Sequence, residues 1–383
     1  MTPDTLIVRY GEIGLKGRNR SHFENLLCKD IRAFLKREGV PFRAVDRFHG
    51  RIYVRGINRE VSLERVLGVF SFSPAREVPR RMQDLKKAAE TFFPQVRQAG
   101  SFRISCQRVD KDFPLTSMEV ERRLGEDVRL ATGATVNLSS PGFNLEVEIG
   151  PDAFFVFSRR VAGFGGMPFG SAGKLVALIS GGIDSPVAAF LMMKRGVEPI
   201  LLHFSMGDDD NAKVGNLRRQ LEEFAAGRTI RLETIPHDTL FAGSFEKLRD
   251  NRRLAPYLCV ICKYLMHRHA GELARRTGAL GIVTGDSLAQ VASQTLSNMA
   301  AYRAESGLPV YSPLIGLDKV EIIDLARRIG TYELSIAPAE GCSPPSNPRT
   351  HVDREVFQSI LEESGLEPSS EGEEPSSESA ARA

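Results

Sequence analysis

Three kinds of feature are scarce or missing in this sequence, and each absence excludes a class of protein. No apolar run approaches the roughly 20 residues that a membrane-spanning helix needs, and residues 1–10 lack a signal-peptide pattern. Five cysteines in 383 residues are too few, and odd in number, for a disulfide scaffold. No internal repeat occurs, and 42% hydrophobic with 26% charged residues excludes collagen-like and fully disordered chains. We therefore expect a cytoplasmic protein with reduced thiols, two or three domains and no membrane partner.

Charge is unevenly distributed along the chain. The formal net charge is +3, but residues 367–383 hold five glutamates and one arginine, which leaves the rest at +7. Residues 1–57 alone carry twelve Lys and Arg against six Asp and Glu. Such an excess is commonly just solvated surface, and it favours a polyanionic partner only weakly.

The hydrophobic pattern predicts a small basic β-α-β-β unit followed by a second α/β module. In the first unit we expect strands at 6–10, 42–47 and 51–55, a basic glycine-spaced loop at 11–20 and a helix at 23–35. In the second module we expect a helix at 82–97 and strands at 102–106, 143–149 and 153–157. A capping box at 116–119 should begin a further helix, which ends at Gly133. The second module shows no acid–base or metal constellation, so we expect it to bind rather than catalyse.

Residues 163–173 contain five glycines and one proline and are typical of a linker. Short apolar strands are then predicted at 175–179, 200–203, 229–235 and 281–284, separated by helical stretches. Alternation of this kind indicates a parallel, doubly wound sheet. Residues 366–383 are rich in Ser, Glu, Pro and Gly, and we expect a disordered acidic tail there.

The segment Ser180-Gly181-Gly182-Ile183-Asp184-Ser185 joins an apolar strand to an apolar helix. The glycines let backbone N–H groups approach phosphate oxygens, the serines add hydroxyl donors, and the helix N-terminus favours negative charge. The Walker A pattern is not met, because Lys174 precedes the strand. The alternative is a small-residue turn without a ligand.

This segment resembles the SGGxDS fingerprint of the PP-loop ATP pyrophosphatases, which cleave ATP between its α- and β-phosphates and adenylate an oxygen. The released pyrophosphate would lie on this loop. Asp184 is acidic beside phosphates, which is explained if it orients Mg²⁺ or the loop itself.

The resemblance extends over about residues 3–360 to the tRNA 4-thiouridine synthetases, the sulfurtransferases of thiamine and 4-thiouridine biosynthesis. It rests on residues 6–20 (LIVRYGEIGLKGRNR), 108–117 (RVDKDFPLTS), 181–188 (GGIDSPVA) and 313–319 (PLIGLDK). It implies an α/β protein with a ferredoxin-like N-terminal domain at 1–57, a THUMP RNA-binding domain at 58–162, a linker at 163–173 and a PP-loop domain, adenine nucleotide alpha hydrolase-like, at 174–365.

Carried over residue by residue, the resemblance also implies site residues. The ATP contacts fall on Leu178, Ile179, Ser180, Gly181, Gly182, Asp184, Ser185, His203, Phe204, Lys263, Gly285 and Gln294. Cys342 matches the family's sulfur-carrying catalytic cysteine, and Asp184 is the second catalytic candidate. We expect RNA contacts from Lys16, Arg18, Arg20, Arg108 and Lys111.

Two departures from the family pattern matter. Many members end in a rhodanese domain with a further sulfur-bearing cysteine, whereas this chain is expected to end in the acidic tail. It has instead Cys259 and Cys262 directly before Lys263, as in rhodanese-less members where this pair and the later cysteine, here Cys342, ligate an iron–sulfur cluster. Three thiolates on a [4Fe–4S] cluster would leave one iron open for sulfide.

Three other interpretations of the cysteine pair stay open. His267 and His269 follow it, which allows a zinc site, although the spacing is not a usual finger pattern. The pair could act as a dithiol that reduces a persulfide on Cys342. Both cysteines could also be packing residues, as we expect for Cys28 and Cys106.

The function hypothesis is an ATP-dependent tRNA sulfurtransferase that makes 4-thiouridine, at position 8, through an adenylated uridine. Its cofactors would be ATP, Mg²⁺ and a candidate [4Fe–4S] cluster. Its partners would be tRNA, a sulfur donor (sulfide or a cysteine desulfurase persulfide) and, in a candidate homodimer, a second copy. The alternatives are sulfur transfer to the thiamine thiazole, another PP-loop tRNA-modifying or amide-forming synthetase, and a tRNA-binding chaperone with a decayed ATP site.

Overall fold

The computed structural model describes residues 3–241, 243–303, 307–339, 341, 342, 345 and 347–366. The chain divides into two compact units, the first built on residues 1–173 with 192–198 and 221–230, the second on the rest. Apart from Leu366, the expected acidic tail lies outside the described residues. Within these ranges, no helix combines the length and apolar character that crossing a bilayer requires.

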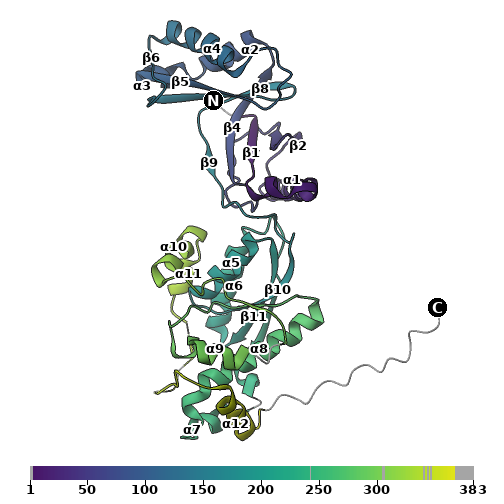
Figure 1. Cartoon of the computed structure of the whole chain (residues 1–383), viewed down its shortest axis with the longest axis vertical. Coiled ribbons are helices and arrows are strands. Elements are labelled where there is room, and N and C mark those ends of the chain that lie inside the picture. The colour runs from purple at the N-terminus through teal and green to yellow at the C-terminus, as the bar shows by residue number, and fades with distance from the viewer. Residues whose placement is uncertain are drawn as a thin grey trace, which may run out of the picture. The chain divides into compact units, whose positions relative to one another are not determined.

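Nine strands in the described chain of the first unit form one mixed sheet, ordered β2-β3-β1-β4-β8-β7-β5-β6 with β9 beside β4 (Figure 1). The strands are β1 Thr5–Arg9, β2 Ala44–Phe48, β3 Arg51–Arg55, β4 Ser71–Pro79, β5 Ser101–Arg108, β6 Thr135–Val136, β7 Phe143–Ile149, β8 Ala153–Phe157 and β9 Val161–Ala162. Pairing is antiparallel except for β5 with β6 and β7. The predicted strands of both N-terminal modules are therefore present.

Strand β4 is an element that the sequence pattern did not predict. Residues 71–75 pair with β1, and residues 76–79 of the same strand pair with β8. Pro74 and Pro79 lie within it, and proline inside a strand pattern argues against a strand because it cannot donate to the ladder. Each proline has a strand partner on one side only, Pro74 in β1 and Pro79 in β8, so a missing N–H is tolerated there. One strand thus belongs to both halves of the sheet.

The helices of the first unit follow the predicted periodicity with one correction. Helix α1 (Arg20–Arg37) buries Leu27, Ile31 and Leu35 at helical spacing, and α4 (Ser117–Thr132) begins with the predicted capping box of Thr116 and Glu119. The single helix expected at 82–97 is instead two, α2 (Met82–Glu90) and α3 (Phe93–Ala99). Pro94 is tolerated in the first turn of α3 but would disrupt a continuous helix.

The second unit contains the predicted parallel sheet, in the order β12-β11-β10-β13-β14. Its strands are β10 Gly173–Ile179, β11 Val197–Ser205, β12 Leu232–Pro236, β13 Ile282–Val283 and β14 Val310–Tyr311. The pairs β11–β12, β10–β13 and β13–β14 are parallel. The expected linker at 163–173 precedes β10 and is not a free spacer, because it buries Met167 and Phe169.

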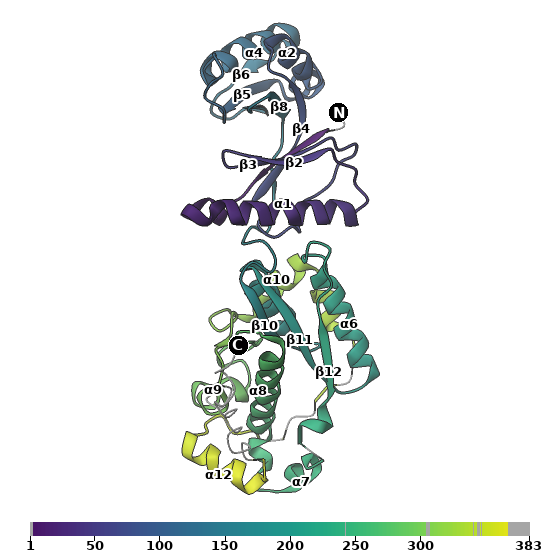
Figure 2. The ribbon, with the colours of Figure 1, turned by 90° about the vertical axis from the view of Figure 1, so that its right-hand side faces the viewer.

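Helices cover this sheet, and Figure 2 shows α6 and α8 on opposite sides of it. The helices are α5 Asp184–Lys194, α6 Asp208–Glu222, α7 Phe245–Asp250, α8 Leu258–Thr277, α9 Leu296–Arg303, α10 Lys319–Ile329, α11 Tyr332–Ile336 and α12 Arg354–Ser364. Alternate residues of β11 (Ile200, Leu202 and Phe204) share one core with Ile261 and Tyr264 of α8. The α/β fold class predicted from the sequence is therefore confirmed.

Helix α8 also buries His267 with both ring nitrogens lacking hydrogen-bond partners among the described residues. Its ring contacts that of Tyr302. Burial, followed by the nearby Lys263 charge, lowers the pKa of His267 from 6.5 to about 3. The folded state therefore keeps this histidine neutral where the unfolded chain binds a proton.

We predict that replacing His267 with leucine makes the stability of the protein less sensitive to acid. In the wild type, the free energy of unfolding should fall as the pH drops below 6.5. His267 alone should account for a loss of about 1.4 kcal/mol near pH 5.5. Urea unfolding followed by circular dichroism at about pH 7.5 and 5.5 measures the difference. His22→Leu, at an exposed histidine, is the control and should keep the wild-type pH dependence. An unchanged difference in H267L would contradict a neutral buried histidine.

Candidate functional site

The bend between β10 and α5 is built from short side chains that bond to its own backbone. The Ser180 N–H donates to Ser185 Oγ at 2.9 Å, and the two hydroxyl oxygens lie 3.1 Å apart. The Gly182 N–H donates to Ser180 Oγ at 3.4 Å. Because the first N–H groups of a helix have no intrahelical acceptors, an anion at this bend meets donors and a favourable dipole.

Gly285 fixes the space beside this bend. A Cβ at this position would lie 2.8 Å from the backbone nitrogen of Ser185 and 2.9 Å from its Cα. Both are backbone atoms at the start of α5, so neither can move aside as a flexible side chain could. The close approach of the Gly285 segment to the bend therefore requires glycine.

A cavity of about 240 Å³ opens at the bend. All the residues expected to contact ATP except Gly181 and His203 line it, together with Leu202, Met266 and Thr284. Residues from five separate segments between 178 and 294 thus meet at the carboxyl end of the parallel strands. Open α/β sheets bind ligands at this edge.

His203 lies behind the cavity rather than in its wall. Its side chain is buried, with Nδ1 3.1 Å from the carbonyl oxygen of Ile179 and Nε2 3.1 Å from Asp210 Oδ2. Gly181 lies next to the same group, since a Cβ there would be 3.3 Å from Asp210 Oδ1. These contacts place the His203 ring against the end of β10 and outside the cavity lining, and its contact with ATP stays a prediction.

Asp184 has two partners that the sequence did not single out. Its Oδ1 accepts from Lys319 Nζ at 2.6 Å and its Oδ2 accepts from Gln290 Nε2 at 2.8 Å. Lys319 is the first residue of α10, and its side chain is 42% exposed. The motif at 313–319 carried the resemblance, but it did not reveal that its lysine reaches the aspartate of the bend.

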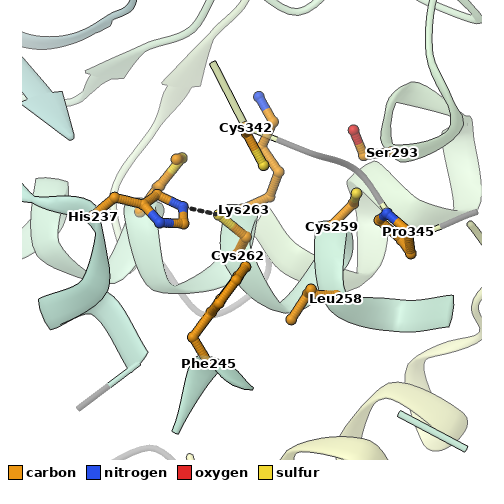
Figure 3. Close-up of a pocket in the computed structure, with 10 residues that line it drawn as sticks. His237, Phe245, Leu258, Cys259, Cys262, Lys263, Ser293, Cys342 and Pro345 are labelled. Atoms are coloured by element: carbon orange, nitrogen blue, oxygen red, sulfur yellow. Dashed lines mark hydrogen bonds between the residues drawn. The ribbon is translucent and has the colours of Figure 1, made fainter. Parts of the chain in front are cut away.

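A second cavity, of about 170 Å³, brings three cysteines together (Figure 3). Cys259 and Cys262 lie in the first turns of α8, and Cys342 comes from the segment before α12. His237 also lines this cavity, and its Nε2 lies 3.4 Å from Cys262 Sγ. Sequence reasoning missed His237; its one signal was its place directly after strand β12.

Burial raises the pKa of every thiol in this cavity. It raises the pKa of Cys262 to about 12, with the neighbouring Cys342 adding to the effect and Lys263 opposing it. The pKa values of Cys259 and Cys342 are also raised, again chiefly by burial. The three groups are therefore neutral thiols near pH 7, and they become thiolates only where a cation or metal stabilises that form.

The three cysteines are the type of ligand that an iron–sulfur cluster needs, but their side chains are not arranged around a common metal position. Three sulfur atoms facing one cavity are the soft ligands that such clusters use. Across the described ranges, however, no three His, Cys, Asp or Glu side chains are grouped as metal ligands. His267 and His269, considered for zinc, do not line this cavity.

Lys263 and Met266 line both cavities. They lie within one turn of each other on α8, so this helix turn forms a wall shared by the bend cavity and the cysteine cavity. Figure 3 shows Lys263 beside Cys262 and Cys342. Any group in one cavity that must react with a group in the other would meet at this wall.

The residues expected to contact RNA lie in the first unit, and their side chains differ in exposure and in hydrogen-bond partners. Arg18 and Lys111 are exposed, and Lys16 is half-buried over the ring of Phe23. Arg20 donates to Glu24 and to Tyr10, whereas Arg108 donates to the carbonyls of Phe113 and Leu115. Arg108 therefore shapes its own loop, and Arg18 and Lys111 are the more accessible cations.

The fold and the bend together define a class of protein: a PP-loop domain preceded by ferredoxin-like and THUMP modules. The ferredoxin-like domain of the ThiI family matches residues 5–73, and the THUMP domain matches residues 79–159. The family described as thiamine biosynthesis protein (ThiI) matches residues 170–365. The chain belongs to this family.

Relatives cover nearly the whole chain. A probable tRNA sulfurtransferase of Thermococcus kodakarensis is 43% identical over 348 residues, covering 88% of this chain and 90% of its own. That of Methanothermobacter thermautotrophicus is 39% identical, covering 91% and 90%. A solved 4-thiouridine synthetase–RNA complex with bound ATP is 31% identical with a TM-score of 0.84, covering 95% of each chain. A Pyrococcus horikoshii structure is 29% identical with a TM-score of 0.68, covering 85% and 99%.

We predict that Cys342 reacts with iodoacetamide at least about tenfold faster than Cys262, Cys28 or Cys106. Cys342 is exposed, whereas burial raises the pKa of these three thiols to about 12, 11 and 12. Peptide mass spectrometry of metal-free protein at successive times measures the rates. A Cys342→Ser control should lose only the fast-reacting peptide. Equally fast labelling of Cys262 would contradict the burial of its thiol in the structure.

Proposed function

We propose that this protein is an ATP-dependent tRNA sulfurtransferase that converts a tRNA uridine, at position 8, to 4-thiouridine. The observation that carries the proposal is the shared wall of Lys263 and Met266 between the bend cavity and the three-cysteine cavity. A phosphate-binding bend on one side and thiols on the other are what activation followed by sulfur transfer requires. Membership of the family and its named relatives supports the same reaction.

In the first half-reaction ATP would occupy the bend cavity. The uridine O4 attacks the α-phosphorus, and pyrophosphate leaves with the electron pair of the broken P–O bond, held by the N–H groups and hydroxyls at 180–185. Asp184 is the one carboxylate among the described residues lining this cavity, and it would hold Mg²⁺, which neutralises phosphate charge. Lys319 would then be released from Asp184 toward phosphate oxygens.

In the second half-reaction a sulfur nucleophile attacks C4, and AMP leaves with the electrons of the C4–O bond. Adenylation is needed because a carbonyl oxygen is a poor leaving group until it carries a phosphoryl ester. If Cys342 carries a persulfide, its terminal sulfur attacks C4, and a thiol of Cys259 or Cys262 then displaces the product and forms a disulfide with Cys342. If Cys259, Cys262 and Cys342 hold a [4Fe–4S] cluster, they would supply its thiolate ligands, and the bound cluster would supply sulfide as the nucleophile.

The basic first unit would bind the tRNA. Arg18 and Lys111 are exposed cations of that unit, and phosphate contacts of this kind position an RNA without reading its sequence. The description of the family as a thiamine biosynthesis protein favours one second candidate, sulfur transfer for the thiamine thiazole. Nucleoside mass spectrometry of tRNA incubated with protein, ATP and sulfide tests the first function, and unmodified tRNA would reject it.

We predict that Asp184→Ala abolishes tRNA-dependent ATP–pyrophosphate exchange, while Cys342→Ala retains exchange and loses thiolation. Asp184 belongs to the bend that cleaves ATP, whereas Cys342 belongs to the sulfur cavity. Asp324→Ala, an exposed acid outside both cavities, is the control for Asp184 and should keep both activities. If the Cys342→Ala variant thiolates tRNA at the wild-type rate with sulfide as donor, Cys342 is not a catalytic residue.

We expect anaerobically purified protein to contain iron and acid-labile sulfide if the three cysteines ligate a cluster. Substituting any one of Cys259, Cys262 or Cys342 by serine should then lower the iron content by at least about half, because each supplies one thiolate. Iron and sulfide analysis with the absorption spectrum measures this. Cys106→Ser, outside the cavity, should leave the iron content unchanged. If iron-free protein thiolates tRNA, the cluster is rejected and sulfur transfer through a persulfide on Cys342 remains.

A further inference from the structure

Asp286 is a carboxylate that the proposed chemistry has not used, and it is completely buried. It follows Gly285 in the segment that closes the bend cavity, but it does not line that cavity. A buried carboxylate is costly unless charged and hydrogen-bonding partners surround it. Asp286 has such partners, and they are divided between its two oxygens.

One oxygen, Oδ2, is held by the surrounding framework. It accepts from Thr284 Oγ1 at 2.8 Å and from the Arg303 guanidinium at 2.8 Å, with the Tyr302 hydroxyl at 3.4 Å. Thr284 follows strand β13, and Tyr302 and Arg303 end α9. Two separate elements thus fix the direction of the carboxylate.

The other oxygen, Oδ1, faces the site. It accepts from Lys263 Nζ at 3.1 Å and from Gln294 Nε2 at 3.4 Å. Both donors line the bend cavity, and Lys263 also lines the cysteine cavity. The carboxylate therefore joins a rigid framework to two side chains that face the ligand space.

The consequence for each donor is different. Lysine is a flexible side chain, and this one is 28% exposed, so a fixed counter-ion confines its ammonium group to the shared wall. Gln294 donates through its nitrogen, which leaves its buried Oε1 without a hydrogen-bond partner in the described chain. A buried acceptor without a partner at a cavity wall suits a ligand donor such as an amino or hydroxyl group of a nucleotide.

We propose that Asp286, anchored by Arg303 and Thr284, is a positioning residue that holds Lys263 and Gln294 in the geometry that receives ATP. The inference rests on the proposed function, since it assigns the bend cavity to the nucleotide. Burial alone would raise the pKa of Asp286, but Lys263, Arg303 and Thr284 outweigh burial and keep that pKa below its ordinary value. The carboxylate is therefore an anion at every pH at which the enzyme would work.

Double-mutant cycles on ATP affinity test the proposal in the full-length chain. Calorimetric titration with ATP and Mg²⁺ should give Asp286→Asn a Kd about tenfold weaker than that of the wild type. The same substitution is then made in proteins that already carry Lys263→Met or Gln294→Ala. There, the fold-change in Kd caused by Asp286→Asn should be at least about threefold smaller than in the wild type. A role in general stability would not produce this coupling, because the loss would then be the same in every background.

Leu361→Ala is the matched control, because Leu361 is buried in the core that contains Tyr302 and lines neither cavity. Its effect on ATP affinity should be small and equal with or without Lys263. If Asp286→Asn does not fold, Arg303→Lys, which keeps the charge and loses the planar fork, replaces it in the cycles, with the same sign of coupling expected.

Additive effects in both cycles would overturn the positioning role while leaving the proposed function intact. Wild-type protein that does not bind ATP would overturn the proposed function, and this inference with it. Coupling with Lys263 and Gln294 but not in the Leu361 control supports the inference.

Discussion

The site depends on one constraint, the sharp bend at which β10 becomes α5. Backbone N–H groups can converge there only because its residues are small and the Gly285 segment approaches without a side chain. The apolar strand before it and the buried helix after it hold the bend at the carboxyl edge of the parallel sheet. Asp184 and the residues that arrive from α8, α10 and the segment after β13 are all arranged around this edge. Without the bend they would be unrelated surface groups.

A second relationship is the adjacency of two chemically different cavities. One is polar at the bend and the other carries three neutral thiols, yet they share a turn of α8. A helix is a suitable divider because residues three and four apart project from one face, here Cys259, Cys262, Lys263 and Met266. Chemistry that activates an oxygen and then replaces it with sulfur needs both environments within reach of one atom. The turn of α8 that carries Lys263 and Met266 places the two cavities side by side.

Much of this arrangement could be predicted from the sequence, and the misses have physical causes. The alternation of strands and helices gave the parallel sheet, and the motif at 180–185 identified the bend. Strand β4 was missed because its prolines argue against a strand until partners on both sides are known. His237 and Asp286 were missed because their significance lies in contacts with Cys262 and Lys263, distant in sequence from each. His203 belongs to the right strand end, but the local pattern could not show that its ring turns behind the cavity wall.

Strand β4 has a mechanical consequence for the first unit of the protein. Since its first residues complete one ladder and its last residues complete another, the two modules are joined by a continuous strand rather than by a loop. Without residues 71–79, strands β1 and β8 would each lose a neighbour and become exposed edges, which favour aggregation. The two modules of the first unit are therefore joined through a strand that each of them needs.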